Sequence, residues 1–570
     1  MDTIRHGEML AAGAGEGPLL RSDVGLSFWG GVDPLTGMVI DRHHPLHGQS
    51  LDGKILAIPS GRGSCTGSVA LLELILNGRA PAAIVACESE EILSLGALVA
   101  RALFERAMPV LRVDRADFAD LGRYAHARVA GGRLELFHAP PTDVWRPAPA
   151  ALDVGSSVRL DPIDEAFLAG RHGVAAQTAM RLLLETARIQ RAPGFIDVSQ
   201  AHIDGCIYTG PASLRFARKF ADWGARVRVP TTLNAISVDK RRWRALGVSA
   251  DLGDPAAALA DAYVEMGAAA SYTCAPYLLS GAPAFGAQIG WAESNAVVYA
   301  NSVIGARTLK YPDFLDLCVA LTGRAPESGC HTNSGRRATI GLIAERPDGA
   351  DDSFWPLLGL ACGEVCGGEI PLIVGLEGSA PTTDDLKAFS AAFATNSAAA
   401  MFHMAGVTPE ADGQNPSVAR TIARQDLRRT WQGLNTAQTP EIGLVSLGNP
   451  HFSPTEFAAF VALVQGRRKA PQVEVVVTCG RAVHEEAERG GHVDAVESFG
   501  ARIVTDTCWC MLGEPVIPPA ARTLMTNSGK YARYAPGLTG RAVRFGSMAA
   551  CVEAACAGSA GAAPPKWLDW

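Results

Sequence analysis

Short apolar runs alternate with longer amphipathic stretches along the first quarter of the chain. The runs GKILAIP, PAAIVAC and MPVLRVD, which begin at residues 53, 81 and 108, have the length and composition of buried strands. Between them, SVALLELILNG and ESEEILSLGALVARALFERA have the apolar spacing of helices. The pattern predicts a βαβαβ unit over about residues 18 to 150.

The rest of the chain divides into two further parts. Residues from about 160 to 435 are rich in predicted helices, separated by loops dense in Asn, Ser, Cys, Glu and Arg. Beyond residue 440, four buried strands are each followed by a polar loop, as in EIGLVSL-GNPHFS and ARIVT-DTCWC. Ligands of open α/β sheets bind at the carboxyl ends of the strands. We therefore expect one crevice lined by side chains of these loops: Asn449, His451, Cys479, Cys508, Cys510, Asn527 and Lys530.

Local signals add boundaries to this α/β organisation. Ser453, Pro454 and Glu456 have the order of a capping box with proline at the first helical position. Proline and glycine accumulate in HAPPTDVWRPAPAALDVGSS, which predicts a domain boundary near residue 150. The predicted domains are residues 1–150 and 160–570.

Composition narrows the class of protein. With 570 residues, 48% of them hydrophobic, the chain can bury a large core. The formal net charge of -7 gives no basic footprint for nucleic acid, and no apolar run reaches the length of a membrane span. The first residues lack the apolar region of a signal peptide. We expect a monomeric cytoplasmic protein with a small-molecule ligand.

The stretch IPSGRGSCTGSVALLELILNG, residues 58–78, combines a glycine-rich turn with the start of a helix. Backbone N–H groups at such a turn point outward at the positive end of the helix dipole. The turn has neither the order of a P-loop nor the spacing of a dinucleotide fingerprint. It predicts a site for a phosphate, a carboxylate or an alkoxide, with Arg62 and several hydroxyls beside it.

The 13 cysteines include no tight CxxC pair typical of structural zinc. A metal site would therefore need cysteines from separate loops. Those in polar loops at strand ends are Cys274, Cys330, Cys479 and Cys508. Cys508 and Cys510 are two residues apart and would point to opposite sides of an extended chain.

Six motifs together resemble the aconitase X family, the divergent branch of the aconitase superfamily. They are PSGRGSCTGS, YTCAPYLL, GWAESNAVVYANSVIGART, LGNPHFS, VTDTC and TNSGKYARYAPG, and they span about residues 20 to 550. The resemblance implies a large multi-subdomain α/β catalytic body with an N-terminal swivelling β/α domain fused to it. It also implies a hydro-lyase that converts cis-3-hydroxy-L-proline to Δ1-pyrroline-2-carboxylate.

The resemblance further implies roles for individual residues. Ser64 matches the catalytic base of the superfamily's turn, with Arg62, Cys65 and Thr66 beside it. Cys274 and Cys508 match ligands of an iron–sulfur cluster. Where the family has Gly-Cys-Pro-His, this chain has Gly-Asn-Pro-His, and we count Asn449 and His451 among the metal-site residues. We expect Cys330 as the third cysteine ligand, with Cys510 and Cys479 as the next candidates, and a 2Fe-2S cluster rather than 3Fe-4S or 4Fe-4S.

Polar residues in the remaining motifs are candidates to bind substrate. Asn527, Lys530 and Asn295 suit a carboxylate or hydroxyl, and Glu293 and His451 suit proton transfer or ligand orientation. Three alternatives stay open: dehydration of mevalonate 5-phosphate or another hydroxy acid, a metal-free dehydratase, and an iron- or redox-sensing RNA-binding protein.

Overall fold

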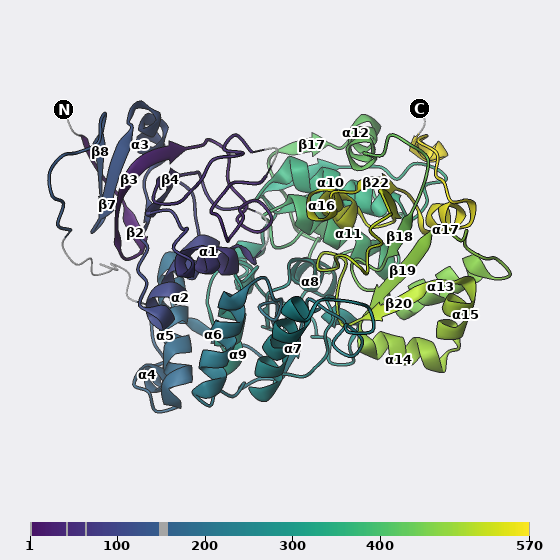
Figure 1. The fold of residues 1–570 in the computed structure, drawn as a ribbon, viewed down its shortest axis with the longest axis horizontal. Helices are drawn as coiled ribbons and strands as arrows, with labels where there is room; N and C mark the ends of the chain where they lie inside the picture. The colour runs from purple at the N-terminus through teal and green to yellow at the C-terminus, as the bar shows by residue number, and fades with distance from the viewer. Residues whose placement is uncertain (1–2, 42–43, 63–64, 148–157, 569–570) are drawn as a thin grey trace. The chain divides into compact units, whose positions relative to one another are not determined.

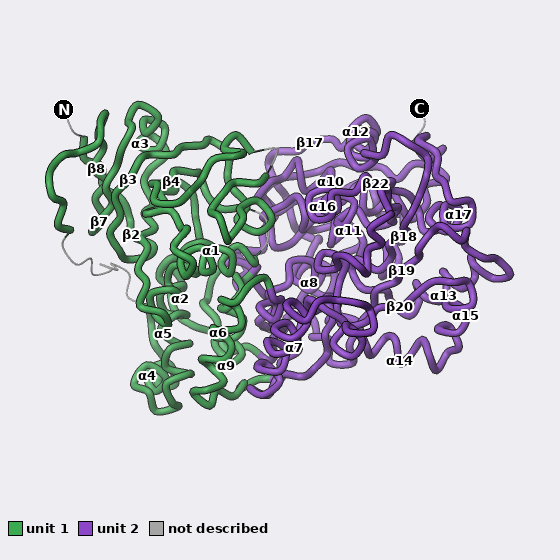
Figure 2. The backbone as a smooth tube through the Cα atoms, in the orientation of Figure 1, with its two compact units in different colours: residues 1–198, 209–229, 311–328 green, residues 199–208, 230–310, 329–570 purple. Residues whose placement is uncertain are grey.

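A computed structural model describes residues 3–41, 44–62, 65–147 and 158–568. The domain boundary predicted near residue 150 lies outside these described residues. The chain forms two compact units (Figure 2). Unit 1 comprises residues 1–198, 209–229 and 311–328, and unit 2 comprises residues 199–208, 230–310 and 329–570.

Unit 1 is built on a mixed sheet of eight strands. Strands β3, β4, β5 and β6 are parallel, and the outer pairings are antiparallel. In sheet order the strands are β1 (Thr3–His6), β8 (Arg133–Phe137), β7 (His126–Ala130), β3 (Ala14–Arg21), β4 (Ile55–Ala57), β5 (Ala83–Ala86), β6 (Val110–Arg112) and β2 (Glu8–Ala11). The predicted βαβαβ order is confirmed by β4, α1 (Gly67–Leu76), β5, α2 (Ile92–Phe104) and β6.

Further helices complete unit 1 (Figure 1). They are α3 (Arg115–Asp120), α4 (Pro162–Leu168), α5 (Gly173–Ile189), α6 (Pro211–Asp222) and α9 (Leu315–Thr322), with the short strands β9 (Phe195–Asp197) and β13 (Arg324–Pro326). Arg324 is buried and pairs with Asp164 at 2.8 Å and with Asp161 at 2.6 Å, which ties β13 to the start of α4. The helical part of unit 1 is therefore fastened by buried charge as well as by apolar packing.

Unit 2 contains three parallel sheets. In sheet order they are β11 (Thr231–Leu233), β10 (Ala201–Ile203) and β12 (Gly290–Trp291); β16 (His403–Met404), β15 (Pro371–Val374), β14 (Ile340–Ile343) and β17 (Ala419–Thr421); and β20 (Arg502–Thr505), β19 (Glu474–Cys479), β18 (Leu444–Leu447), β21 (Thr523–Thr526) and β22 (Ala542–Phe545). The last sheet contains the four strands predicted beyond residue 440.

Helices surround these sheets in the α/β arrangement that was predicted (Figure 1). They are α7 (Ala250–Glu265), α8 (Ser294–Tyr299), α10 (Phe354–Cys366), α11 (Thr383–Asn396), α12 (Arg424–Leu434), α13 (Pro454–Val464), α14 (Arg481–Arg489), α15 (His492–Phe499), α16 (Gly529–Thr539) and α17 (Met548–Ala557). The capping box is confirmed, because Ser453 Oγ accepts from Glu456 N at 3.0 Å and Ser453 N donates to Glu456 at 2.8 Å. In the described residues, no helix has the length and apolar character needed to cross a membrane.

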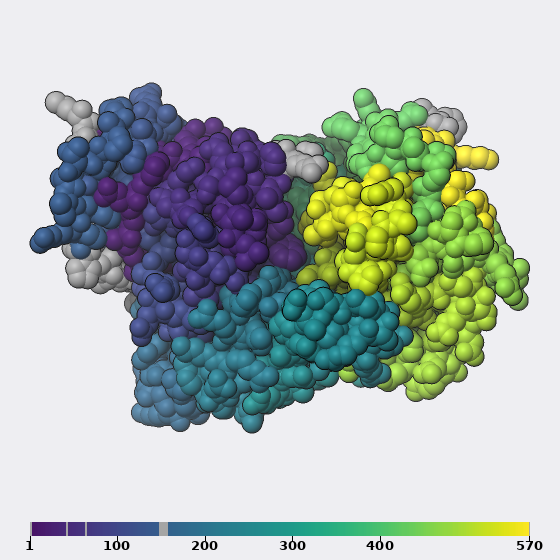
Figure 3. Space-filling model, in the orientation of Figure 1, coloured from purple at the N-terminus to yellow at the C-terminus, as the bar shows by residue number. Residues whose placement is uncertain are grey.

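Alternating side chains of β18 pack on opposite faces of its sheet. Leu444 belongs to the large core shared with the four-stranded sheet and with α10, α11 and α16. Val445 belongs to a second core with α13, α15 and α17. Such a sheet, covered on both faces, leaves the loops at the carboxyl ends of its strands as the place for a site. In Figure 3, yellow residues from the C-terminal part of the chain form part of the visible face of unit 2.

Candidate active site

Three cysteines gather in unit 2 beyond the carboxyl ends of the five-stranded sheet. Cys274 and Cys508 are buried and pack together with Ala235, and Cys510 packs against them. Cys508 and Cys510 follow β20, whereas Cys274 comes from the loop after α7. Two of the three thiols therefore come from one strand-end loop, and the third comes from a loop that follows a helix.

The position of Cys510 differs from that expected for an extended chain. The segment after β20 turns at Asp506, which has a φ of 68°. Arg481 holds the Asp506 carboxylate with two hydrogen bonds of 2.8 and 2.6 Å, and Asp506 O accepts from Ile236 N at 2.7 Å. Beyond Asp506, residues 509 to 511 form a further turn. Both thiols therefore lie on one side, where they hydrogen-bond to each other.

His451 has a role different from the metal ligand suggested by the sequence. Its Nε2 lies 2.8 Å from Thr507 O, and its Nδ1 lies 3.2 Å from Thr273 Oγ1. Since a carbonyl only accepts, Nε2 carries the proton and Nδ1 accepts from the threonine. Both ring nitrogens are used, and burial lowers the pKa of His451 to about 4, which keeps the ring neutral. His451 therefore clamps the residues that precede Cys274 and Cys508.

The backbone and side chains of the same loop also reach the thiols. His451 N donates to Cys274 Sγ at 3.3 Å, and Asn449 Nδ2 donates to Cys510 Sγ at 3.4 Å. The sequence suggested Asn449 as a ligand in place of the family's cysteine, but here its amide nitrogen is a hydrogen-bond donor to a neighbouring thiol. Lys387 on α11 also contacts this loop, because its Nζ donates to His451 O at 3.2 Å.

A buried ion pair lies beside the cysteines. Lys530 Nζ is 3.0 Å from Glu293 Oε1, with side-chain exposures of 17% and 6%. Glu293 also accepts from Ala296 N at 2.8 Å and from the amide of Asn295. Asn295 in turn donates to Cys274 O at 2.9 Å. Three of the predicted substrate-binding residues thus form one network with a predicted ligand.

Burial, hydrogen bonding and nearby charge shift the pKa values of the three thiols in different directions. Burial raises the pKa of Cys274 to about 12. The hydrogen bond between Cys508 and Cys510 raises the pKa of Cys508 and lowers that of Cys510, and Lys530 lowers the latter further. Burial opposes the charge of Lys530, but Glu293 and Cys510 raise its pKa above the ordinary value. The group therefore favours one thiolate, at Cys510, beside an ammonium.

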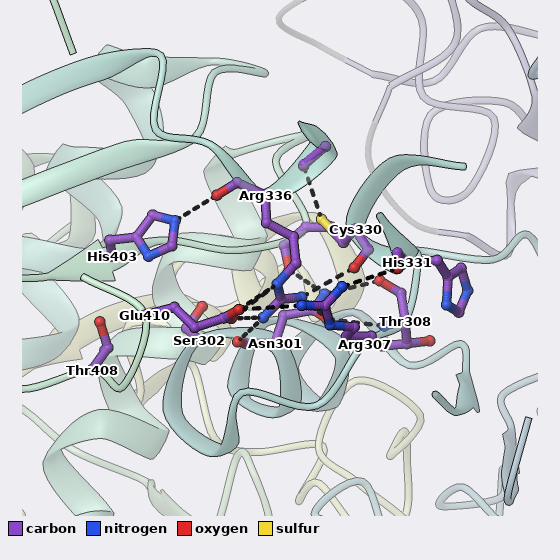
Figure 4. A network of polar contacts seen from close by, with 12 residues as sticks. Asn301, Ser302, Arg307, Thr308, Cys330, His331, Arg336, His403, Thr408 and Glu410 are labelled. Atoms are coloured by element: carbon purple, nitrogen blue, oxygen red, sulfur yellow. Dashed lines mark hydrogen bonds and ion pairs between the residues drawn. The ribbon is translucent and has the colours of Figure 1, made fainter. Parts of the chain in front are cut away.

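Cys330 is not brought together with these cysteines. Figure 4 shows it with Arg336, Asn301 and Glu410. Its thiol donates to Gly335 O at 3.6 Å and its carbonyl accepts from Arg336 at 3.2 Å, while Arg336 donates to Glu410 at 2.9 Å. The prediction of Cys330 as third ligand does not fit this geometry, because a separate arginine network surrounds its short loop. Cys510, the next candidate from the sequence, is the third cysteine that packs with Cys274 and Cys508.

Asn527 lies at the same sheet edge as Asn449. It follows β21, and the two asparagines line one small cavity with Lys387 and Ser528. Cys479 ends β19 and is fully buried, and burial beside Asp506 raises its pKa. Cys479 is therefore part of the core, although the sequence analysis placed it among the residues lining the crevice.

The glycine-rich turn belongs to unit 1, and Ser64, the predicted base, lies outside the described residues. Arg62 pairs with Asp41 at 3.1 Å and is half exposed, whereas Cys65 and Thr66 are buried at the start of α1. The N–H of Gly61 donates to the buried carboxylate of Glu90, and that of Arg62 donates to Leu26 O at 3.3 Å. Two of the N–H groups expected to hold a ligand are thus used within the chain.

Sequence reasoning missed several residues of this site. Thr273 and Thr507 anchor His451, Tyr277 OH donates to Asn295 Oδ1 at 3.0 Å, and Lys387 supports the loop. Thr273 and Thr507 immediately precede the predicted ligands Cys274 and Cys508, and this position was the sequence signal that could have identified them. Lys387 lies in a helix far along the chain, and nothing in its local sequence marks it.

The thiol group suits some kinds of metal centre better than others. Within residues 3–41, 44–62, 65–147 and 158–568, no three His, Cys, Asp or Glu side chains converge as ligands of a single metal ion. In an iron–sulfur cluster the thiolates bind different iron atoms, so the cysteines need not converge on a single point. Three packed soft ligands beside a lysine fit such a group better than a hard cation.

Comparisons with known proteins agree across the whole chain. Four domain models match: the aconitase X swivel domain at residues 4–136, first domain at 157–334, second domain at 338–432 and third domain at 442–557. The chain is 57% identical to cis-3-hydroxy-L-proline dehydratase of Pseudomonas aeruginosa, covering 98% of each chain. It is 51% identical to the enzyme of the same name from Hypocrea jecorina, covering 96% of this chain and 94% of that one.

A solved structure supports the same assignment. The holo-form of Thermococcus kodakaraensis aconitase X is 28% identical and superposes with a TM-score of 0.63, covering 70% of this chain and 100% of that chain. The Pseudomonas aeruginosa and Hypocrea jecorina proteins are dehydratases by name, that is, carbon–oxygen lyases that remove water. With its four domains and its identity to these enzymes over almost its full length, the chain is a dehydratase that belongs to the aconitase X family.

Proposed function

We propose that this chain dehydrates cis-3-hydroxy-L-proline to Δ1-pyrroline-2-carboxylate. The observation that carries the proposal is the identity of 57% and 51%, over nearly the whole chain, to two enzymes named for this substrate. The reaction needs a base at C2 and electrophilic help at C3, because the α-proton is weakly acidic and hydroxide is a poor leaving group. The glycine-rich turn and the thiol group are the candidates for these two tasks.

The thiols of Cys274, Cys508 and Cys510 would hold an iron–sulfur cluster of the 2Fe-2S type. Their packing, the hydrogen bonds from His451 N and Asn449 Nδ2, and the adjacent Lys530 support this ligand set over one that includes Cys330. When bound, such a cluster supplies a Lewis acid that polarises an oxygen of the substrate.

Residues of the chain would carry the remaining steps. Ser64 takes the C2 proton, the C3–O bond breaks as the C2–C3 double bond forms, and the oxygen leaves as water after gaining a proton. The resulting enamine tautomerises to Δ1-pyrroline-2-carboxylate. Lys530 binds the carboxylate, Asn527 binds the hydroxyl, and the ion pair of Lys530 with Glu293 holds the lysine in place.

Proton NMR in D2O tests the reaction and the base. Anaerobically purified protein is incubated with cis-3-hydroxy-L-proline, with a Ser64→Ala variant alongside. Pyrroline-2-carboxylate is expected with the parent, and a rate at least a hundredfold lower is expected with the variant. Equal rates would refute the base. No product from iron-loaded parent protein would refute the substrate, and mevalonate 5-phosphate would then be tested.

Single cysteine variants test the ligand set. Cys508→Ser and Cys510→Ser are expected to lose most of the bound iron and the visible absorption of the parent. Cys330→Ser is the matched control, since it removes a buried thiol from the same unit and should keep both signals. Loss of iron in Cys330→Ser with retention in Cys510→Ser would restore the ligand set expected from the sequence.

A further inference from the structure

One acceptor atom beside the thiols has no partner in the described chain. Asn449 is 7% exposed, and its Oδ1 is buried without a hydrogen bond to any described residue. The Nδ2 of the same amide donates to Cys510 Sγ at 3.4 Å. In this orientation of the amide, Nδ2 is used by the sulfur and Oδ1 is the atom left without a partner. A buried carbonyl oxygen left unsatisfied is costly, so it calls for a donor that the described residues do not supply.

The space next to Asn449 limits the size of that donor. A cavity of about 20 Å³ is lined by Lys387, Ala388, Gly448, Asn449, Pro450, Glu456, Asn527, Ser528 and Gly529. This volume has room for one water-sized group and cannot contain a five-membered ring. The cavity therefore accepts one end of a ligand whose remainder lies outside it.

The surrounding charges favour a cationic donor. Lys387 is almost fully buried and pairs with both Glu456 and Asp384, the latter at 3.5 Å. Two carboxylates thus face one ammonium, and an anion would meet excess negative charge here. Ser528 Oγ already accepts from Tyr531 N at 3.1 Å as the cap of α16. Among the described side-chain atoms that line the cavity, Asn449 Oδ1 is the one that is buried without a hydrogen-bond partner.

We propose that Asn449 Oδ1 accepts the ring N–H of the substrate, so that Asn449 determines specificity for a cyclic amino acid. The proposal rests on the function proposed above and adds a residue that recognises the ring nitrogen of the substrate rather than its hydroxyl. A site built to bind an N–H group discriminates strongly against an analogue that lacks it, because its buried acceptor is then left unpaired. A water molecule has the same donor chemistry, and the experiment separates the two sources.

The test compares two unreactive ligands of nearly equal shape. L-Proline carries the ring N–H, and (S)-tetrahydrofuran-2-carboxylate has an oxygen in its place. Their dissociation constants are measured by calorimetry on iron-loaded protein. The parent is expected to bind L-proline at least tenfold more tightly. Asn449→Ala is expected to bring the ratio of the two constants close to one, and Asn449→Asp, which keeps an acceptor, to retain the preference.

Controls keep the proposal separate from folding and from the proposed function. Asn415→Ala changes an exposed asparagine of the same unit and should leave the ratio as in the parent. Thermal melting and visible absorption check that each variant is folded and loaded. An unchanged ratio in folded Asn449→Ala, or equal binding of both ligands by the parent with a water on Asn449 in its crystal structure, would overturn the proposal. If the parent fails to dehydrate cis-3-hydroxy-L-proline, the proposed function itself fails.

Discussion

The glycine-rich turn of unit 1 and the thiol group of unit 2 are held in different ways. The described part of the turn is held through its backbone N–H groups, with Glu90 as the buried acceptor for Gly61. The thiol group is held by side chains, above all His451, Asn295 and the pair of Lys530 with Glu293. The turn's own side chains take little part in these contacts, whereas the side-chain network depends on each member. We therefore expect the thiol group to be more sensitive than the turn to substitution of its own residues.

The largest effect is expected for Lys530→Met in unit 2. The substitution leaves the buried carboxylate of Glu293 without its partner and should lower the free energy of unfolding by about 3–5 kcal/mol. Arg62→Met in unit 1 is the comparison, because Arg62 is 47% exposed and its pair with Asp41 should contribute less than about 1 kcal/mol. Urea unfolding followed by hydrogen exchange of each unit measures both.

A double variant checks the cause of the Lys530 effect. Lys530→Met combined with Glu293→Gln removes both charges and should recover part of the lost stability. If the double variant is no more stable than Lys530→Met, or if Arg62→Met is as costly, the contrast between the units is wrong.

Acid should destabilise unit 2 through its buried histidines. Burial lowers the pKa of His202 and of His331 to about 3 from 6.5. Both rings stay neutral in the folded protein while those of the unfolded chain gain protons, so stability is full above pH 6.5 and falls as the pH drops toward 3. At pH 5 the loss is about 2 kcal/mol for each histidine.

Hydrogen exchange of unit 2 between pH 7 and pH 5 measures this loss. His202→Gln and His331→Gln should each make the pH dependence shallower, because glutamine does not titrate. His484, which is only partly buried, provides the control, and His484→Gln should leave the slope as in the parent. Equal slopes in all four proteins would contradict the role given to burial.

Unit 1 should show the opposite dependence on pH. Burial raises the pKa of Glu90 from 4.5 to about 7, so its contribution is full below pH 4.5 and is lost as the pH rises through 7. The loss is about 3 kcal/mol, and Glu90→Gln should lessen it. Exchange of unit 1 between pH 5 and pH 8 measures the slope, with Glu88→Gln, at an exposed ion pair, as the control. A parent and a Glu90→Gln variant with the same slope would refute the assignment.

Much of the fold follows from local patterns, since apolar runs specify β18 to β21 and the capping box specifies the start of α13. Strands β1 and β3 of unit 1 were not predicted, because they are half exposed and depend on pairing with distant partners. The meeting of Cys274 and Cys508 was predicted through the family resemblance. The places of Cys510 and Cys330 were not, because they depend on the turn at Asp506 and on the network around Arg336.

The ring of His451 has a mechanical consequence. Its two nitrogens contact Thr273 and Thr507, so a flat five-membered ring acts as a spacer of fixed length between two loops that are far apart in the sequence. Long flexible side chains would let that separation vary with temperature, whereas an aromatic ring has no internal torsion to absorb it. The spacing of the two loops is thus defined by covalent geometry, and any residue that replaces His451 must match the length of the ring as well as its polarity.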